Sequence, residues 1–66
     1  MDGILKNTVL AEAMSMEIPV YEYEDSNGSI YIQSSFEYLN TYYSISGMLE
    51  QEEFEKILEN IWIKNA

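Results

Sequence analysis

The sequence contains no cysteine, no histidine and no arginine. Without cysteine, no disulfide can stabilise the fold. Without histidine, both the commonest transition-metal ligand and the commonest general base are missing. Phosphate contacts require lysine or arginine, and this chain has only three lysines. We therefore expect no cofactor, no metal site, no enzymatic activity and no direct binding of nucleic acid.

The sequence also lacks long apolar segments. No run approaches the roughly 20 apolar residues of a membrane span, and the first residues are not those of a signal peptide. We expect no membrane insertion and a cytoplasmic location for the chain as written. A fragment of a larger exported protein would instead be extracytoplasmic. The length of 66 residues predicts a single domain, residues 1–66, with a thin core.

Acidic and aromatic residues are abundant in this short chain. Twelve acidic residues against three lysines give a net charge of −9, and hydrophobic residues make up 47% of the sequence. Six tyrosines, two phenylalanines and one tryptophan can fill a core, which argues against disorder. A strongly negative field attracts basic surfaces. The composition therefore predicts a folded acidic domain that binds a protein partner with a basic surface.

The N-terminal residues 2–16 show helical spacing of apolar side chains. Asp2 is a suitable N-cap, and Pro19 ends any helix that precedes it. We expect a short N-terminal helix whose apolar stripe consists of Leu5, Val9, Ala13 and Met16.

Asn27-Gly28 lies between two segments rich in β-forming residues, 18–25 and 29–35. This dipeptide is typical of a two-residue type I′ hairpin turn. The turn would pair Glu24 with Tyr31. It would place Tyr21, Tyr23, Ile30 and Ile32 on an apolar face, and Glu22, Glu24, Tyr31 and Gln33 on a polar one.

After the hairpin we expect a third strand over residues 41–46 and a C-terminal helix over residues 50–63. The predicted fold is therefore α+β in the order α-β-β-β-α. A small three-stranded antiparallel sheet carries the C-terminal amphipathic helix across one face, in addition to the short N-terminal helix. The buried stripe of the C-terminal helix is Phe54, Ile57, Leu58 and Ile61.

Residues 29–63 resemble a known family. The pattern begins with the aromatic residue Phe36 and a polar turn, followed by Tyr43-Ser44-Ile45-Ser46-Gly47. A leucine and several acidic residues then precede the predicted amphipathic helix. This pattern is similar to the C-terminal part of a bacterial domain family of unknown function that is found in membrane-anchored and anti-sigma-factor-like proteins. The family usually has Trp at the position of Phe36, and Ser or Asp at that of Glu50. The resemblance implies a non-catalytic regulatory or sensing module and transfers no active-site residues.

Acidic side chains of the hairpin and of the C-terminal helix could contact a partner, although an ordinary solvated surface also explains them. Trp62 adjoins the helical stripe as a boundary core residue or an interface anchor. The candidate partner-binding residues are Glu22, Glu24, Tyr31, Glu52, Glu55 and Trp62.

Two functions remain open from the sequence. The first is a regulatory or sensing interaction module. The alternative is a stand-alone inhibitor, for instance phage-encoded, whose acidic surface occupies the basic site of a nucleic-acid-binding protein such as a defence nuclease. In either case we expect a homodimer, because a three-stranded sheet leaves two free edges and C2 pairing is the commonest solution.

Overall fold

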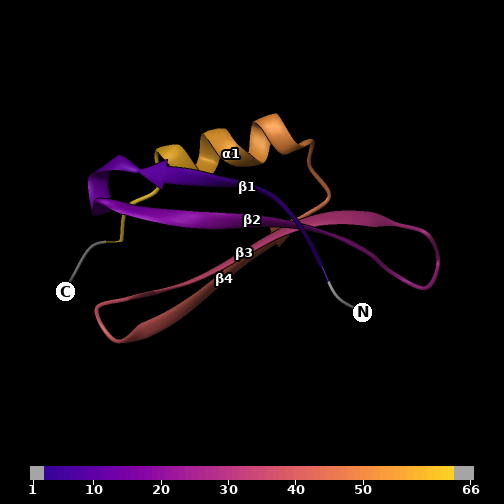
Figure 1. Ribbon diagram of the computed structural model, residues 1–66, viewed down its shortest axis with the longest axis horizontal. Helices are drawn as coiled ribbons and strands as arrows, with labels where there is room; N and C mark the ends of the chain where they lie inside the picture. Colours follow the sequence, from indigo (N-terminus) through magenta and orange to yellow (C-terminus); the bar gives the residue numbers. More distant parts are fainter. Residues whose placement is uncertain (1–2, 64–66) are drawn as a thin grey trace.

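The computed structural model describes residues 3–63, which form one antiparallel sheet and one α-helix. The strands follow chain order in the sheet, β1-β2-β3-β4, and α1 lies alongside β1 (Figure 1). A short 3-10 helix, η1, connects the first two strands. The elements are β1 (Ile4–Ala11), η1 (Glu12–Met14), β2 (Met16–Glu24), β3 (Ile30–Tyr38), β4 (Thr41–Gly47) and α1 (Gln51–Glu59).

The predicted three-stranded sheet with an N-terminal helix is wrong, because residues 4–11 form the fourth strand, β1. Val9 and the neighbouring alternate residue Ala11 are buried, whereas Leu5 of the predicted helical stripe is 56% exposed. Burial therefore follows a period of two residues. Pairing with β2 overrides the helical spacing of the apolar residues. Asp2, the predicted N-cap, lies outside the described residues.

The sheet divides into two hairpins that diverge from each other (Figure 1). Only Tyr21 to Glu24 of β2 pair with β3. The first half of β2 pairs with β1, and the second half of β3 pairs with β4. Pro19 lies in the half of β2 without a β3 partner, so its missing N–H removes no bond to β3. Both hairpins contribute to one core cluster, which includes Ile18 and Val20 of β2 and Phe36 of β3.

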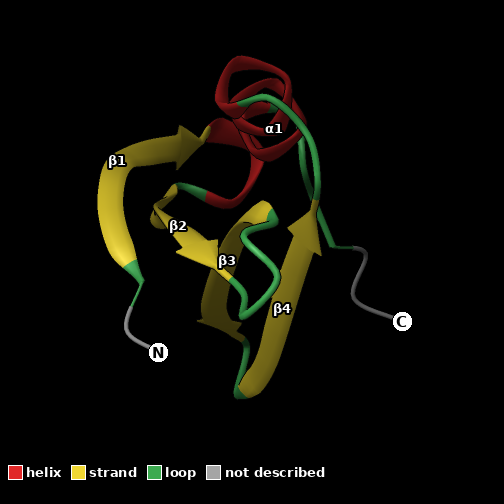
Figure 2. Ribbon diagram, turned by 90° about the vertical axis from the view of Figure 1, so that its right-hand side faces the viewer, coloured by secondary structure: helices red, strands yellow, loops and turns green. Residues whose placement is uncertain are grey.

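Phe54 and Leu58 anchor α1 in this core, with exposed fractions of 1% and 0%. They lie four residues apart and so occupy one face of the helix. Figure 2 shows the strands in an arc with β1 and β4 at its ends and α1 above the opening. The core residues are Val9, Ala11, Met14, Ile18, Val20, Ile32, Phe36, Phe54 and Leu58.

Two expectations for the C-terminal helix are wrong. The helix ends at Glu59 instead of residue 63, and Ile57 is 48% exposed. Ile57 lies at the border of the narrow buried face defined by Phe54 and Leu58. Ile61 follows the helix as irregular chain and packs partly buried against the core.

The β2–β3 hairpin exists as predicted, but its type I′ turn is wrong. The Gly28 N–H donates to the Asp25 carbonyl at 3.0 Å, and the Asp25 N–H donates to the Ser29 carbonyl at 2.9 Å. These bonds enclose a three-residue loop in which Gly28 has a φ of +83°. Asp25 Oδ1 stabilises this loop by accepting the backbone N–H groups of Asn27 at 2.8 Å and Ser29 at 2.9 Å.

The extra loop residue shifts the hairpin register by one position, which moves side chains to the opposite face. Tyr23 pairs with Tyr31, and their rings stack with centroids 5.4 Å apart. Glu22 pairs with Ile32. The tyrosines therefore lie on the face away from the core, instead of joining the isoleucines as predicted.

The predicted third strand is confirmed as β4. Tyr43 and Ile45 are partly buried against the core, and the Tyr43 ring stacks on Phe36 with centroids 5.5 Å apart. Leu39 and Asn40 connect β3 to β4 with φ values of 51° and 67°. A two-residue turn with both central residues at positive φ is the type I′ geometry. The sequence predicted this geometry at the other hairpin.

Candidate functional site

The structure separates the residues predicted to form one partner-binding surface on the hairpin. Glu22 and Glu24 lie on the face of Ile30 and Ile32, whereas Tyr31 lies on the opposite face of the sheet. The predicted combination of these acids with Tyr31 therefore does not form one patch. Whether each residue contacts a partner stays a prediction.

The predicted residues near the C-terminus lie in three different settings. Glu52 is exposed in the first turn of α1. Glu55 is half-buried and faces β1, to which it is hydrogen-bonded. Trp62 follows the helix and is 61% exposed. Of these residues, Glu55 lines a concave part of the surface.

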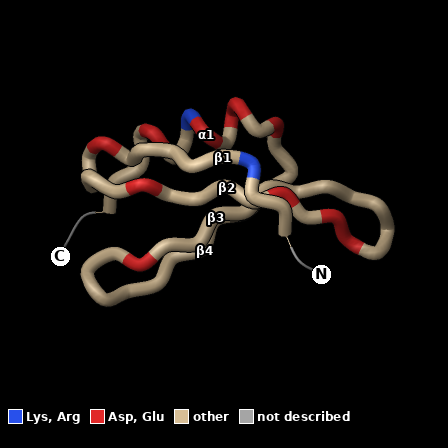
Figure 3. Tube along the Cα trace, viewed as in Figure 1, with Lys and Arg blue, Asp and Glu red and all other residues tan. Residues whose placement is uncertain are grey.

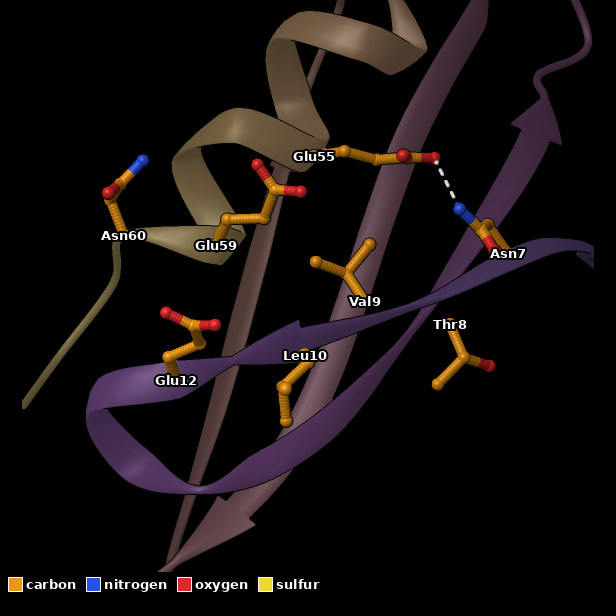
Figure 4. A pocket seen from close by; sticks show the side chains of 8 residues that line it. All are labelled: Asn7, Thr8, Val9, Leu10, Glu12, Glu55, Glu59 and Asn60. Atoms are coloured by element: carbon orange, nitrogen blue, oxygen red, sulfur yellow. Dashed lines mark hydrogen bonds between the residues drawn. The ribbon is translucent and has the colours of Figure 1, made fainter.

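A groove of about 460 Å³ runs between β1 and α1 (Figure 4). Four consecutive residues of β1 form one wall, so the groove extends around the outer edge of the strand. The helix and its C-terminal end form the other wall. The lining residues are Asn7, Thr8, Val9, Leu10, Glu12, Glu55, Glu59 and Asn60.

Hydrogen bonds fix the position of Glu55 in this groove. Asn7 Nδ2 donates to Glu55 Oε2 at 3.2 Å, and Gln51 Nε2 donates to the same oxygen at 2.7 Å. Asn7 faces the helix because it lies opposite the buried Val20, after a bulge between Leu5 and Asn7. Both donors are neutral amides. The carboxylate is therefore oriented without its charge being neutralised.

The groove is negatively charged. Its lining includes the carboxylates of Glu12, Glu55 and Glu59, and neither lysine of the described part of the chain, Lys6 or Lys56, lines it. Acidic residues also occur along α1 and in the β2–β3 hairpin (Figure 3). Carboxylates beside a concave surface produce a local negative potential that attracts cationic groups.

The outer edge of β1 presents backbone groups to this groove. Within residues 3–63, β1 pairs only with β2. Thr8 lies opposite Pro19, which has no N–H and cannot complete a hydrogen-bonded pair. In the alternating antiparallel pattern, the backbone groups of Thr8 therefore point outward, as do those of Leu10 two residues later. The groove thus combines free hydrogen-bonding groups with negative charge.

Sequence reasoning placed Glu55 among the candidate partner-binding residues and Glu59 on the same side of the helix, but it missed Asn7 and Glu12. The reason is the helix predicted over residues 2–16, since the groove exists only when this segment is an edge strand. The adjacent β-branched residues Thr8 and Val9 were a signal for a strand.

Residues 3–63 contain no group of three or more histidine, cysteine, aspartate or glutamate side chains that could hold a metal ion. Among these same residues, no helix has the length and apolar character needed to cross a membrane.

Comparison with known proteins identifies the family. No curated protein and no solved structure matches the chain. A family model described as "Domain of unknown function (DUF4367)" matches residues 5–61 of the 66. The match confirms the expected resemblance to a domain family of unknown function and extends it from residues 29–63 to include β1 and β2. Because this match covers nearly the whole chain, the protein belongs to the DUF4367 family.

Proposed function

We propose that this domain is a non-enzymatic interaction module that binds a basic segment of a partner protein through the groove between β1 and α1. The observation that carries the proposal is the composition of the groove. Glu12, Glu55 and Glu59 line it beside the outer edge of β1, which has no strand partner within residues 3–63. The net charge of −9 supports the same partner chemistry, because it accelerates encounter with a positive surface.

Within this function, we propose a regulatory or sensing role. The resemblance of residues 29–63 to domains of membrane-anchored and anti-sigma-factor-like proteins supports that context. The second candidate is an inhibitor that occupies the basic site of a nucleic-acid-binding protein, and the density of acidic residues favours it. The cytoplasmic location expected for the chain as written stays a prediction.

We also propose that the domain forms a homodimer through β4. Within the described residues, β4 is an edge strand that pairs only with β3. Its sequence, from Thr41 to Gly47, contains no charged residue. Unprotected edges of this kind favour pairing between two copies. A β4–β4 contact would leave the groove at the other end of the sheet free.

The function is tested by capture of partners from a cell lysate on the immobilised domain, followed by mass spectrometry. We expect partners with basic surfaces, captured less well as salt rises, because screening weakens contacts between exposed charges. Glu55→Lys should reduce capture, whereas the control Glu37→Lys should not. Glu37 is exposed on β3 and does not line the groove. Capture that is indifferent to both salt and Glu55→Lys would contradict the proposal.

A further inference from the structure

We infer that the groove binds its partner by strand addition: an extended segment pairs with the outer edge of β1 and places basic side chains, at alternate positions, beside Glu55 and Glu59. This inference rests on the proposed function, because it assumes a basic protein partner. It adds the backbone conformation of the bound segment, its side-chain pattern and its location. Each of these follows from a different feature of the groove.

The backbone of β1 supplies the first feature. Thr8 and Leu10 line the groove, and their outward N–H and C=O groups match the pattern that an added strand requires. A peptide that adds a strand to a free edge gains affinity from such main-chain bonds. A helical segment could not use these groups, because its own backbone bonds are internal. The bound segment should therefore be extended.

The second feature is the spacing of the carboxylates on α1. Residues four apart on a helix are separated by about 6 Å along its axis. Alternate residues of a strand are about 6.6 Å apart and lie on the same face. Since α1 runs alongside β1 (Figure 1), Glu55 and Glu59 match the spacing of alternate side chains on an added strand. Lysine or arginine at every second position fits these two acids.

The third feature limits the length of the segment. The β1–β2 register is irregular between Leu5 and Asn7, and β1 ends at Ala11. Regular pairing on the outer edge is therefore confined to residues 7–11. The five residues of this stretch set the size of the added strand. Lys6 is the residue without a partner at this irregularity, and it would repel a basic side chain placed beyond this stretch.

Charge distinguishes a basic segment from a second copy of this domain as the occupant. Pairing of β1 with β1 would bring two grooves together, each lined by Glu12, Glu55 and Glu59. Like charges placed opposite each other on paired strands are destabilising. A strand with alternating basic residues would instead complement these carboxylates. The groove therefore selects a partner different from the domain itself.

The test measures binding of synthetic peptides to the full chain by fluorescence anisotropy. The first peptide alternates lysine with valine. A second has the same composition with its lysines consecutive, and a third is the alternating peptide with N-methyl groups on the backbone amides that would face β1. We expect the alternating peptide to bind at least about tenfold more tightly than either of the others, because each of them loses interactions worth about 1.4 kcal/mol or more.

Variants of the domain locate the site. Glu55→Gln combined with Glu59→Gln should weaken binding of the alternating peptide about tenfold. The matched control, Glu37→Gln combined with Glu53→Gln, removes the same charge from exposed positions outside the groove and should change binding less than twofold. Equal loss in both double variants would overturn the inference, as would full binding of the N-methylated peptide. Full binding of the N-methylated peptide would leave the proposed function standing, because a basic segment could still occupy the groove without strand pairing. Equal loss in both double variants would also contradict the location of the contact in the groove, and failure to capture any basic partner contradicts the function itself.

Discussion

The two edges of the sheet differ in how they are protected. The β1 edge contains a bulge at Lys6, and α1 lies along this edge with carboxylates facing the groove. The β4 edge pairs with β3 in unbroken register from Thr41 to Gly47 and carries no charged side chain. Tyr42 on this strand is 80% exposed. An added strand would therefore meet an irregular edge beside negative charge at β1, and a regular edge without charge at β4.

Charge and irregularity at a strand edge discourage pairing with an identical chain, whereas a regular, neutral edge permits it. We therefore propose separate roles for the two ends of the sheet. We expect β1 to accept a basic segment of another protein and β4 to accept a second copy of this domain.

The β1 groove depends on the packing of α1. Phe54→Ala or Leu58→Ala should lower the free energy of unfolding by about 2–5 kcal/mol, because each removes a fully buried side chain. Ile57→Ala is the matched control and should cost well under half as much, since Ile57 is 48% exposed. Urea denaturation measures all three. A larger loss for Ile57→Ala than for Leu58→Ala would refute the orientation of the helix.

The connection between the two diverging hairpins depends on Gly28. Its φ of +83° disfavours residues with a Cβ atom, and β-branched ones most. Gly28→Val should destabilise the domain by about 1–3 kcal/mol. Asn27→Val should cost less, because the φ of Asn27 is not positive. Thermal unfolding compares the two variants, and an equal loss would favour the two-residue turn that the structure excludes.

The β4 edge is tested by introducing a charge. Ser44→Lys should weaken the homodimer about tenfold or more, because paired copies of β4 would bring like charges together. The control Leu10→Lys, on β1, should leave the dimer intact. Sedimentation equilibrium distinguishes a dimer from the 7.7 kDa monomer. If the unmodified chain sediments only as a monomer at micromolar concentration, the proposed dimer is wrong.

Charge reversal at the two acidic regions should affect partner association unequally. Glu52→Lys with Glu55→Lys should slow association several-fold, because Glu55 lines the groove. Glu22→Lys with Glu24→Lys should have the smaller effect, since these residues do not line it. Stopped-flow measurements at low and physiological salt compare the rates. Greater slowing by the hairpin pair would move the contact from the groove to the hairpin.

The sequence predicted the elements whose local patterns agree with their tertiary contacts. The strand around Tyr43 and Ile45 and the burial of Phe54 and Leu58 belong to this class. The first strand was missed because Leu5, Val9, Ala13 and Met16 fit a helical period, whereas burial is decided by pairing with β2. The spacing of apolar residues within one segment does not show whether another strand pairs with it.

The hairpin register could not be predicted from Asn27-Gly28 alone, since the dipeptide fits both a two-residue and a three-residue loop. The decisive contacts are the bonds from the Asn27 and Ser29 N–H groups to the Asp25 carboxylate. The groove was hidden for a related reason. It contains Asn7 and Glu55, which are 48 positions apart in the sequence and hydrogen-bonded to each other. Their contact requires β1, the strand that the sequence pattern did not predict.

Amide hydrogen exchange followed by NMR, with and without the alternating lysine–valine peptide, tests the difference between the edges most directly. We expect the outward N–H groups of Thr8 and Leu10 to exchange readily in the free domain and to become protected when the peptide binds. The rates of amide exchange in β4 should be the same with and without the peptide, at a fixed concentration of the domain. Protection confined to β4 or to the β2–β3 hairpin, with no change at Thr8 and Leu10, would contradict the account.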